Sequence, residues 1–155
     1  MAFKVFVSYS TRDLPVARAL WTHLRIAGAE VYVAEYSAMP GQSLSKVIAK
    51  AIDECDLFLL LWSTNADQSK WVPQEIGRAK GKGKPIMPVV LHAGIALTGF
   101  IQDLKYLEWY KNPDAVVAWL NDFVLRERAK KDKEQLLGSV IAVGAILLAL
   151  GSGSE

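Results

Sequence analysis

The chain has 155 residues, of which 52% are hydrophobic and 22% charged, a composition that suits one globular domain and excludes a disordered or collagen-like chain. Its 18 basic and 16 acidic residues give a net charge of +2, which argues against a dedicated nucleic-acid-binding protein. The one cysteine, Cys55, excludes an internal disulfide and a cysteine-based zinc site, and the two histidines are far apart in sequence. We therefore expect no metal site and no nucleic-acid partner.

Alternating strands and helices are predicted along most of the chain. Short apolar runs predict five strands, over 3–8, 31–34, 57–62, 86–91 and 104–109. Apolar residues at helical spacing predict four helices, over 14–28, 44–52, 69–80 and 113–128. This order favours an α/β fold with a flavodoxin-like, five-stranded parallel sheet and helices on both faces. In such sheets ligands bind in a crevice at the carboxyl ends of the strands, here beside the first strand.

The C-terminal region divides into a charged run and an apolar run. Residues 126–134 carry five basic and three acidic side chains, and residues 136–150 carry no charge. We expect a domain over 1–129, a charged linker over 130–135 and a hydrophobic helix over 136–152. Fifteen helical residues span roughly 22 Å, against roughly 30 Å of hydrocarbon in a bilayer. The helix is therefore either a single-pass tail or a packing helix of a core or an oligomer.

The expected location is the cytoplasm. The apolar residues at the start of the chain are too few for a secretory signal. Basic residues before a membrane span hold the preceding segment on the cytoplasmic side. A membrane anchor through 136–152 is compatible with this location, and lipid is then a partner of the chain.

A carboxylate and an indole are expected at the crevice. Pro73 is tolerated only in the first turn of a helix, so this helix should begin near Ser69. Trp71 and Glu75 are then four residues apart on one helix face. The positive end of the helix favours the ionised form of Glu75. The spacing by itself supports equally a ligand site and a surface glutamate beside a half-buried tryptophan.

Polar and aromatic residues also follow the first two strands at the same carboxyl edge of the sheet. A plain turn and helix cap after the first strand needs only Thr11 or Asp13, so Tyr9 and Arg12 are available for ligand contact. The loop over 35–43 follows the second strand and is expected to expose Tyr36 as part of a contact surface.

These segments resemble a TIR (Toll/interleukin-1 receptor) domain over roughly residues 3–129. Four stretches carry the resemblance in the family's order: 4–9, 28–33 with 39–41, 55–63, and 63–65 with 69–75. The last is similar to the stretch of plant and bacterial TIR domains that carries the catalytic glutamate, with its Trp-xxx-Glu spacing. Glu75 matches that glutamate.

The resemblance implies a five-stranded parallel sheet and one of two functions. Some family members are adaptors that only assemble with other TIR domains. Others cleave NAD+ at the nicotinamide–ribose bond, giving ADP-ribose or a cyclic isomer, and bacterial examples often act in anti-phage defence. Trp71 with Glu75 favours the enzyme branch, in which Glu75 is catalytic and NAD+ is a substrate rather than a bound cofactor. Whether water or adenine attacks the ribose stays open, and so does the non-catalytic alternative.

The resemblance also implies roles for further residues. Tyr9 and Ser10 fall where family enzymes contact nicotinamide and ribose. Arg12 is the basic residue that remains after the first strand. Ser43 ends the BB loop, and Trp71 packs beside the site. Family enzymes usually complete the site by stacking protomers through this loop, so a homo-oligomer is expected. The expected assembly residues are Tyr36, Ser37, Met39, Pro40 and Gly41. Ala34 and Ala66 depart from the family pattern, which leaves the substrate pose open.

Overall fold

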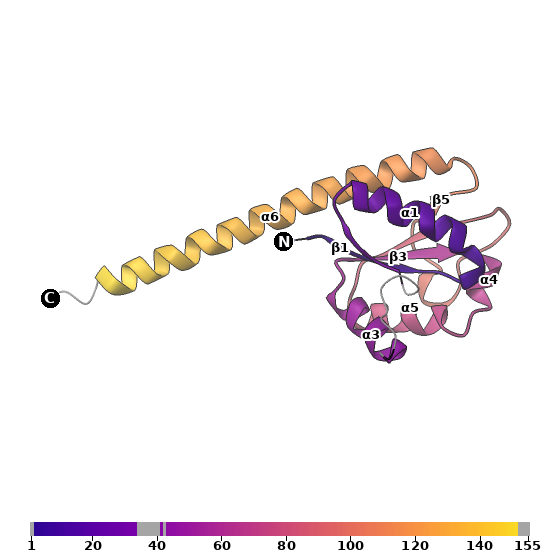
Figure 1. Cartoon of the computed structure of the whole chain (residues 1–155), viewed down its shortest axis with the longest axis horizontal. Coiled ribbons are helices and arrows are strands. Elements are labelled where there is room, and N and C mark those ends of the chain that lie inside the picture. Colours follow the sequence, from indigo (N-terminus) through magenta and orange to yellow (C-terminus); the bar gives the residue numbers. More distant parts are fainter. Residues whose placement is uncertain (1, 34–40, 42, 152–155) are drawn as a thin grey trace.

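Five parallel strands form the centre of the protein in the computed structural model, which describes residues 2–33, 41 and 43–151 (Figure 1). The strands are β1 (Lys4–Ser8), β2 (Glu30–Tyr32), β3 (Leu57–Trp62), β4 (Ile86–Val90) and β5 (Leu107–Glu108). Their order in the sheet is β2-β1-β3-β4-β5, with every neighbouring pair parallel. The predicted flavodoxin-like α/β fold is therefore confirmed. Strand β3 is buried at all six positions, as its unbroken apolar sequence predicted.

Helices cover both faces of this sheet. They are α1 (Leu14–Ile26), α3 (Leu44–Glu54), α4 (Thr64–Asp67), α5 (Val72–Gly81) and α6 (Pro113–Gly151), with short 3-10 helices η1 (Thr11–Asp13) and η2 (Gly99–Ile101). Apolar residues of α1 and the first part of α6 pack on one face. Those of α3 and α5 pack on the other face, which is the side that carries the site.

The helix expected to begin near Ser69 is α5, which begins at Val72, so its predicted start is three residues too early, and a short helix that was not predicted, α4, precedes it. The hydroxyl oxygen of Ser63 accepts a hydrogen bond from the Ala66 backbone N–H at 3.0 Å and caps the short helix α4. The Ser69 hydroxyl then accepts from the backbone N–H groups of Trp71 and Val72, at 3.2 and 3.3 Å. These bonds delay the next helix, so Trp71 is the residue before α5 rather than a residue within it.

An aromatic stack crosses the three strands nearest the site. Phe6 of β1 stands in register with Tyr32 of β2 and Phe58 of β3. Its ring stacks on theirs at centroid distances of 5.3 and 5.4 Å. Because side chains alternate along a strand, Ser8 emerges on the same face as Phe6, one step closer to the carboxyl edge.

Helix α6 continues far beyond the sheet (Figure 1). Val116, Leu120 and Val124 are buried against the domain, whereas the large apolar residues from Leu136 onward are exposed. The helix was expected to end near Arg128 and a linker to occupy 130–135, but α6 runs unbroken from Pro113 to Gly151. The charged run is helical because Arg, Lys, Glu and Ala are good helix formers. Among the helices of the described residues, α6 is the one that is long and apolar enough to cross a membrane.

Candidate active site

Glu75 reaches from α5 to the end of the neighbouring strand β1. The Ser8 hydroxyl donates a hydrogen bond to Glu75 Oε2 at 2.5 Å. Ser8 is buried and is the last residue of β1, and Glu75 is partly buried in the first turn of α5. A carboxylate is therefore fixed at the carboxyl edge of the sheet, where the sequence placed the crevice.

A pocket of about 320 Å³ opens beside this carboxylate. Its wall combines the end of β1 and the following turn, the first half of α3 and the start of α5. The lining residues are Val7, Tyr9, Thr11, Leu44, Ser45, Ile48, Trp71 and Glu75. A second hollow of about 210 Å³ lies between α3 and α5 and shares Ser45, Ile48, Trp71 and Glu75 with the first. The pocket is mostly apolar and aromatic and holds one carboxylate, which suits a ring-bearing ligand with a polar or cationic centre.

Burial changes the protonation of this carboxylate. It raises the pKa of Glu75 to about 7, and the hydrogen bond from Ser8 opposes the rise without cancelling it. Proximity to the helix N-terminus was expected to favour the ionised form, but desolvation outweighs that effect at this position. A glutamate with a pKa near neutrality inside a pocket is typical of a functional carboxylate.

Tyr32 adds a second group to this environment. Its side-chain oxygen is buried and has no hydrogen-bond partner among the described residues. Burial raises the pKa of the Tyr32 hydroxyl, and the charge of Glu75 raises it further. The hydroxyl therefore stays neutral and lies within electrostatic reach of the carboxylate.

The spacing of α3 and α5, which form two walls of the pocket, is held by an ion pair. Arg78 donates to both carboxylate oxygens of Asp53, from Nε at 2.8 Å and from Nη2 at 2.6 Å. The hydrogen bond from Arg78 lowers the pKa of Asp53. A two-point contact of this kind restrains orientation as well as distance.

The turn after β1 is joined to the turn after β3. Asp13 accepts hydrogen bonds from Ser63 Oγ at 2.5 Å and from Asn65 Nδ2 at 3.3 Å. Asp13 was a candidate helix cap, but its side chain makes no capping bond to α1. Its carboxylate instead aligns the two loops that carry Tyr9 and the segment leading to Trp71.

The structure brings some predicted site residues together and not others. Tyr9, Trp71 and Glu75 line the pocket. Ser10 is nearly buried, its hydroxyl accepts from the Arg12 backbone N–H at 3.4 Å, and neither residue lines the pocket. Ser43 precedes α3, with its hydroxyl 3.3 Å from that of the pocket residue Ser45.

The predicted assembly residues fall mostly outside the described part of the chain. Tyr36, Ser37, Met39 and Pro40 lie there, so the contact expected of them stays a prediction. Gly41 is described: it is exposed and has a φ of +85°, a conformation that suits glycine.

The burial of Trp71 and Glu75 is the reverse of that expected for a surface glutamate beside a half-buried tryptophan. Trp71 is 61% exposed, and Glu75 is the partly buried one of the two. Their spacing nevertheless holds, because the Glu75 backbone N–H donates to the Trp71 carbonyl at 3.0 Å. An exposed indole above a pocket and a sheltered carboxylate within it favour a ligand site over a surface role.

Sequence reasoning did not predict several features of the site. The bond from Ser8, a residue of the expected crevice wall, to Glu75 is the most important, and the alternation of β1, which puts Ser8 on the face of Phe6, could have indicated it. The contributions of Leu44, Ser45 and Ile48 depend on how α3 docks, for which the sequence carries no local signal. Within the described residues, no group of three or more His, Cys, Asp or Glu side chains is arranged to hold a metal ion.

The fold and the site thus define an α/β domain with a carboxylate pocket at the carboxyl edge of its parallel sheet. A family model of the TIR domain matches residues 5–121. The chain belongs to the TIR domain family, which confirms the resemblance seen in its sequence. No curated protein matches the chain.

Three solved structures illustrate the shared fold. The TIR domain of the Toll-related receptor TRR-2 from Hydra magnipapillata is 22% identical, with a TM-score of 0.65 over 77% of this chain and 94% of that one. The CMP N-glycosidase BcmB of Clostridium botulinum is 21% identical, with a TM-score of 0.55 over 76% and 98%. The TIR domains of the activated Roq1 resistosome are 21% identical, with a TM-score of 0.55 over 60% of each chain. At these identities the likeness establishes the fold alone.

Proposed function

We propose that this protein is an NAD+ nucleosidase that cleaves the nicotinamide–ribose bond with Glu75 as its catalytic residue. The observation that carries the proposal is the Glu75 carboxylate, fixed by Ser8 at 2.5 Å and facing a pocket that Tyr9 and Trp71 line. NAD+ has a flat cationic nicotinamide ring joined to a ribose, and this pocket offers aromatic surface and a negative charge to such a group.

The chemistry needs only one carboxylate. Ordinary glycosidases use two, because one must protonate the leaving group. Nicotinamide leaves a cationic N-glycosidic bond as a neutral molecule, so no general acid is required. Glu75, the one acidic residue among the described residues that line the pocket, would hold the ribose hydroxyls and stabilise the oxocarbenium-like charge at the anomeric carbon. Attack by water then gives ADP-ribose, and attack by adenine gives a cyclic isomer.

Assembly is part of the proposal. Trp71 is 61% exposed and Leu44 is 49% exposed, although both line the pocket. A second protomer would cover these apolar surfaces and limit the access of bulk water to the reacting bond, in keeping with the stacking that the family resemblance implies. Activity per molecule should therefore rise steeply with protein density. A role in prokaryotic anti-phage signalling follows from the same resemblance.

A second candidate substrate is a nucleoside monophosphate such as CMP. A neutral base must gain a proton as it leaves, and a glutamate with a pKa of about 7 can hold that proton at neutral pH. The likeness to a CMP N-glycosidase makes this substrate a necessary arm of any assay. NAD+ is preferred because one carboxylate cannot both donate a proton and remain the charge that stabilises the cation.

The deciding experiment is turnover by the purified full chain, with vesicles and without, over a wide range of protein concentration. NAD+ and CMP are supplied separately, and products are separated against nicotinamide, cytosine, ADP-ribose and cyclic ADP-ribose. Glu75→Gln should abolish nicotinamide release. Glu54→Gln is the matched control, since it makes the same change on the solvent-exposed end of α3. No release from either substrate in any assembled state would contradict the catalytic reading and favour a non-catalytic adaptor.

The apolar part of α6 is the second element of the proposed function. From Leu136 to Leu150 the helix carries no charge, and its Leu, Ile and Val side chains are exposed. This segment would anchor the chain in a membrane with the TIR domain in the cytoplasm, because basic residues precede it. Confinement on a membrane raises effective concentration and so favours the assembly described above.

A further inference from the structure

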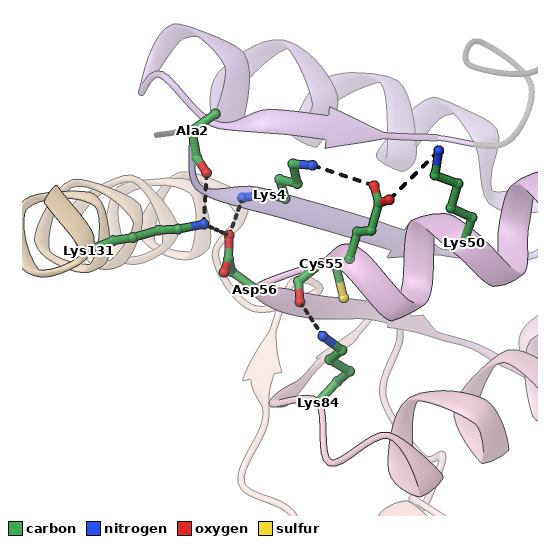
Figure 2. A network of polar contacts seen from close by, with 8 residues as sticks. Ala2, Lys4, Lys50, Cys55, Asp56, Lys84 and Lys131 are labelled. Atoms are coloured by element: carbon green, nitrogen blue, oxygen red, sulfur yellow. Dashed lines mark hydrogen bonds and ion pairs between the residues drawn. The ribbon is translucent and has the colours of Figure 1, made fainter. Parts of the chain in front are cut away.

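Helix α6 is attached by polar contacts to the amino edge of the sheet, the edge opposite the pocket. Lys131 Nζ donates to the Ala2 carbonyl at 3.1 Å and to Asp56 Oδ2 at 2.8 Å, and Asp56 Oδ2 also accepts from the Lys4 backbone N–H at 2.8 Å (Figure 2). Ala2 precedes β1, Lys4 is its first residue, and Asp56 precedes β3. We call this group of four residues the latch.

The latch is sheltered and has support along the helix. The side chains of Lys131 and Asp56 are each 27% exposed, so solvent screens their ion pair less than an open surface pair. One turn earlier, Arg128 donates to the Ala27 carbonyl at 3.1 Å and lies against Gly28, where a Cβ atom would come within 2.1 Å of its guanidinium. Together with the buried apolar residues of its first half, these contacts fix α6 to the domain as far as Lys131.

No flexible joint separates the latch from the apolar part of α6. The helix is continuous, and no glycine or proline occurs between Asp114 and Leu137. Five residues lead from Lys131 to Leu136, which is about 7.5 Å along a helix. The domain and the apolar part of α6, residues 136–150, therefore form one rigid unit. We call this apolar part the rod.

The apolar part of α6 suits a lipid bilayer better than a partner helix. Every Leu, Ile and Val from residue 136 to 150 is exposed. At 100° a residue, these side chains cover roughly two thirds of the circumference. Smaller apolar residues fill the remaining side: Gly138, Ala142, Ala145 and Ala149. A helix that docks on a protein keeps a polar face, whereas one that is apolar all round belongs in a core or a membrane.

We propose that α6 holds the TIR domain on the bilayer in one fixed orientation, with the amino edge of the sheet facing the lipid headgroups and the pocket facing away. This inference rests on the proposed membrane anchor. The apolar part of α6 leaves the domain at the end where β1 begins, and α4 lies at the opposite end (Figure 1). A five-residue strand such as β4 is about 16 Å long, so the pocket edge lies farther from the membrane by up to about that length.

The orientation has a consequence for assembly. Domains anchored this way share one direction relative to the membrane plane. Before assembly their pockets face the cytoplasm, and the sides of the domain are accessible to neighbouring copies. Lateral encounters then start with two rotational freedoms already lost, which lowers the entropic cost of association.

The test compares two labels at opposite ends of β4. Lys82→Cys precedes this strand and Ala93→Cys follows it, and both positions are exposed. The native thiol, Cys55, is buried and should not react. Each full-length variant is labelled with a fluorophore and bound to vesicles whose headgroups carry a nitroxide quencher. We expect loss of emission from the Lys82→Cys label and retained emission from the Ala93→Cys label.

Two variants separate the outcomes. A short Gly-Ser insertion between Lys133 and Glu134 frees the domain from the rod, so both labels should then be quenched alike. The double change Ile141→Lys with Leu148→Lys should remove vesicle binding. Equal quenching of both labels without the insertion would overturn the orientation. Failure of the full chain to bind vesicles, with self-association in solution instead, would overturn the anchor, and NAD+ turnover on the same samples reports separately on catalysis.

Discussion

Replacing the pocket carboxylate should stabilise the folded protein, most strongly at alkaline pH. Glu75 is sheltered in the pocket, where its charged form is desolvated and the Ser8 hydroxyl is its one hydrogen-bond donor among the bonds described. Glu75→Gln keeps the shape of the side chain and an acceptor for Ser8 but removes the charge. The buried charge costs stability only when Glu75 is ionised, so the gain must depend on pH.

The magnitude follows from the pKa of Glu75 in the two states. Burial raises it from an ordinary 4.5 to about 7 in the folded protein. Between these values the folded state binds more protons than the unfolded state, so the free energy of unfolding falls as pH rises and levels off above the folded pKa. At about 1.4 kcal/mol for each pH unit, the gap corresponds to about 3 kcal/mol. Glu75→Gln should recover most of this at pH 8 and little of it near pH 4.5.

Urea denaturation of the full chain in nonionic detergent, at pH 5 and pH 8, measures this difference. The native chain should lose stability between the two pH values relative to Glu75→Gln. Glu54→Gln provides the control, because it removes a carboxylate whose side chain is 48% exposed and pairs with Lys4 at the other edge of the sheet. A gain from Glu75→Gln that is the same at both pH values would refute the reasoning, because it would mean that the desolvated charge does not set the stability.

Three further outcomes are expected from the same site. The kcat/KM for NAD+ should rise with pH up to about 7 and then level off, since the reacting form of Glu75 is the carboxylate; a flat profile from pH 5 to 8 would contradict this role. Ser8→Ala removes a hydrogen bond that stabilises the carboxylate, so the inflection of that profile should move to higher pH, whereas an unchanged inflection would mean that the bond has no influence. Trp71→Ala should lower NAD+ turnover but change the free energy of unfolding by no more than about 0.5 kcal/mol, because the indole is 61% exposed; a large loss of stability would show a packing role instead.

Local patterns in the sequence were sufficient for the fold and for the centre of the site. The six apolar residues of β3 are typical of a strand covered on both faces, and β3 is the middle strand of the sheet. Pro73 limits where α5 can begin, which keeps Trp71 and Glu75 one turn apart at the carboxyl edge. These signals are readable because they arise within a few residues of one another, through strand alternation, helix period and the geometry of proline.

Tertiary structure alone decided what surrounds Glu75 and how α6 is attached to the domain. Ser8 and Glu75 are 67 residues apart, and only the docking of α5 beside β1 makes them partners and buries the carboxylate. Desolvation, which raises the pKa of Glu75, depends on neighbours from α3 that no local pattern identifies. The charged run expected to be a linker is part of helix α6, and only the tertiary structure brings Lys131 to Asp56 and Ala2 and so fixes this helix to the domain. Burial and long-range pairing are properties of the assembled chain, and they gave this domain both its sheltered carboxylate and its rigid apolar rod.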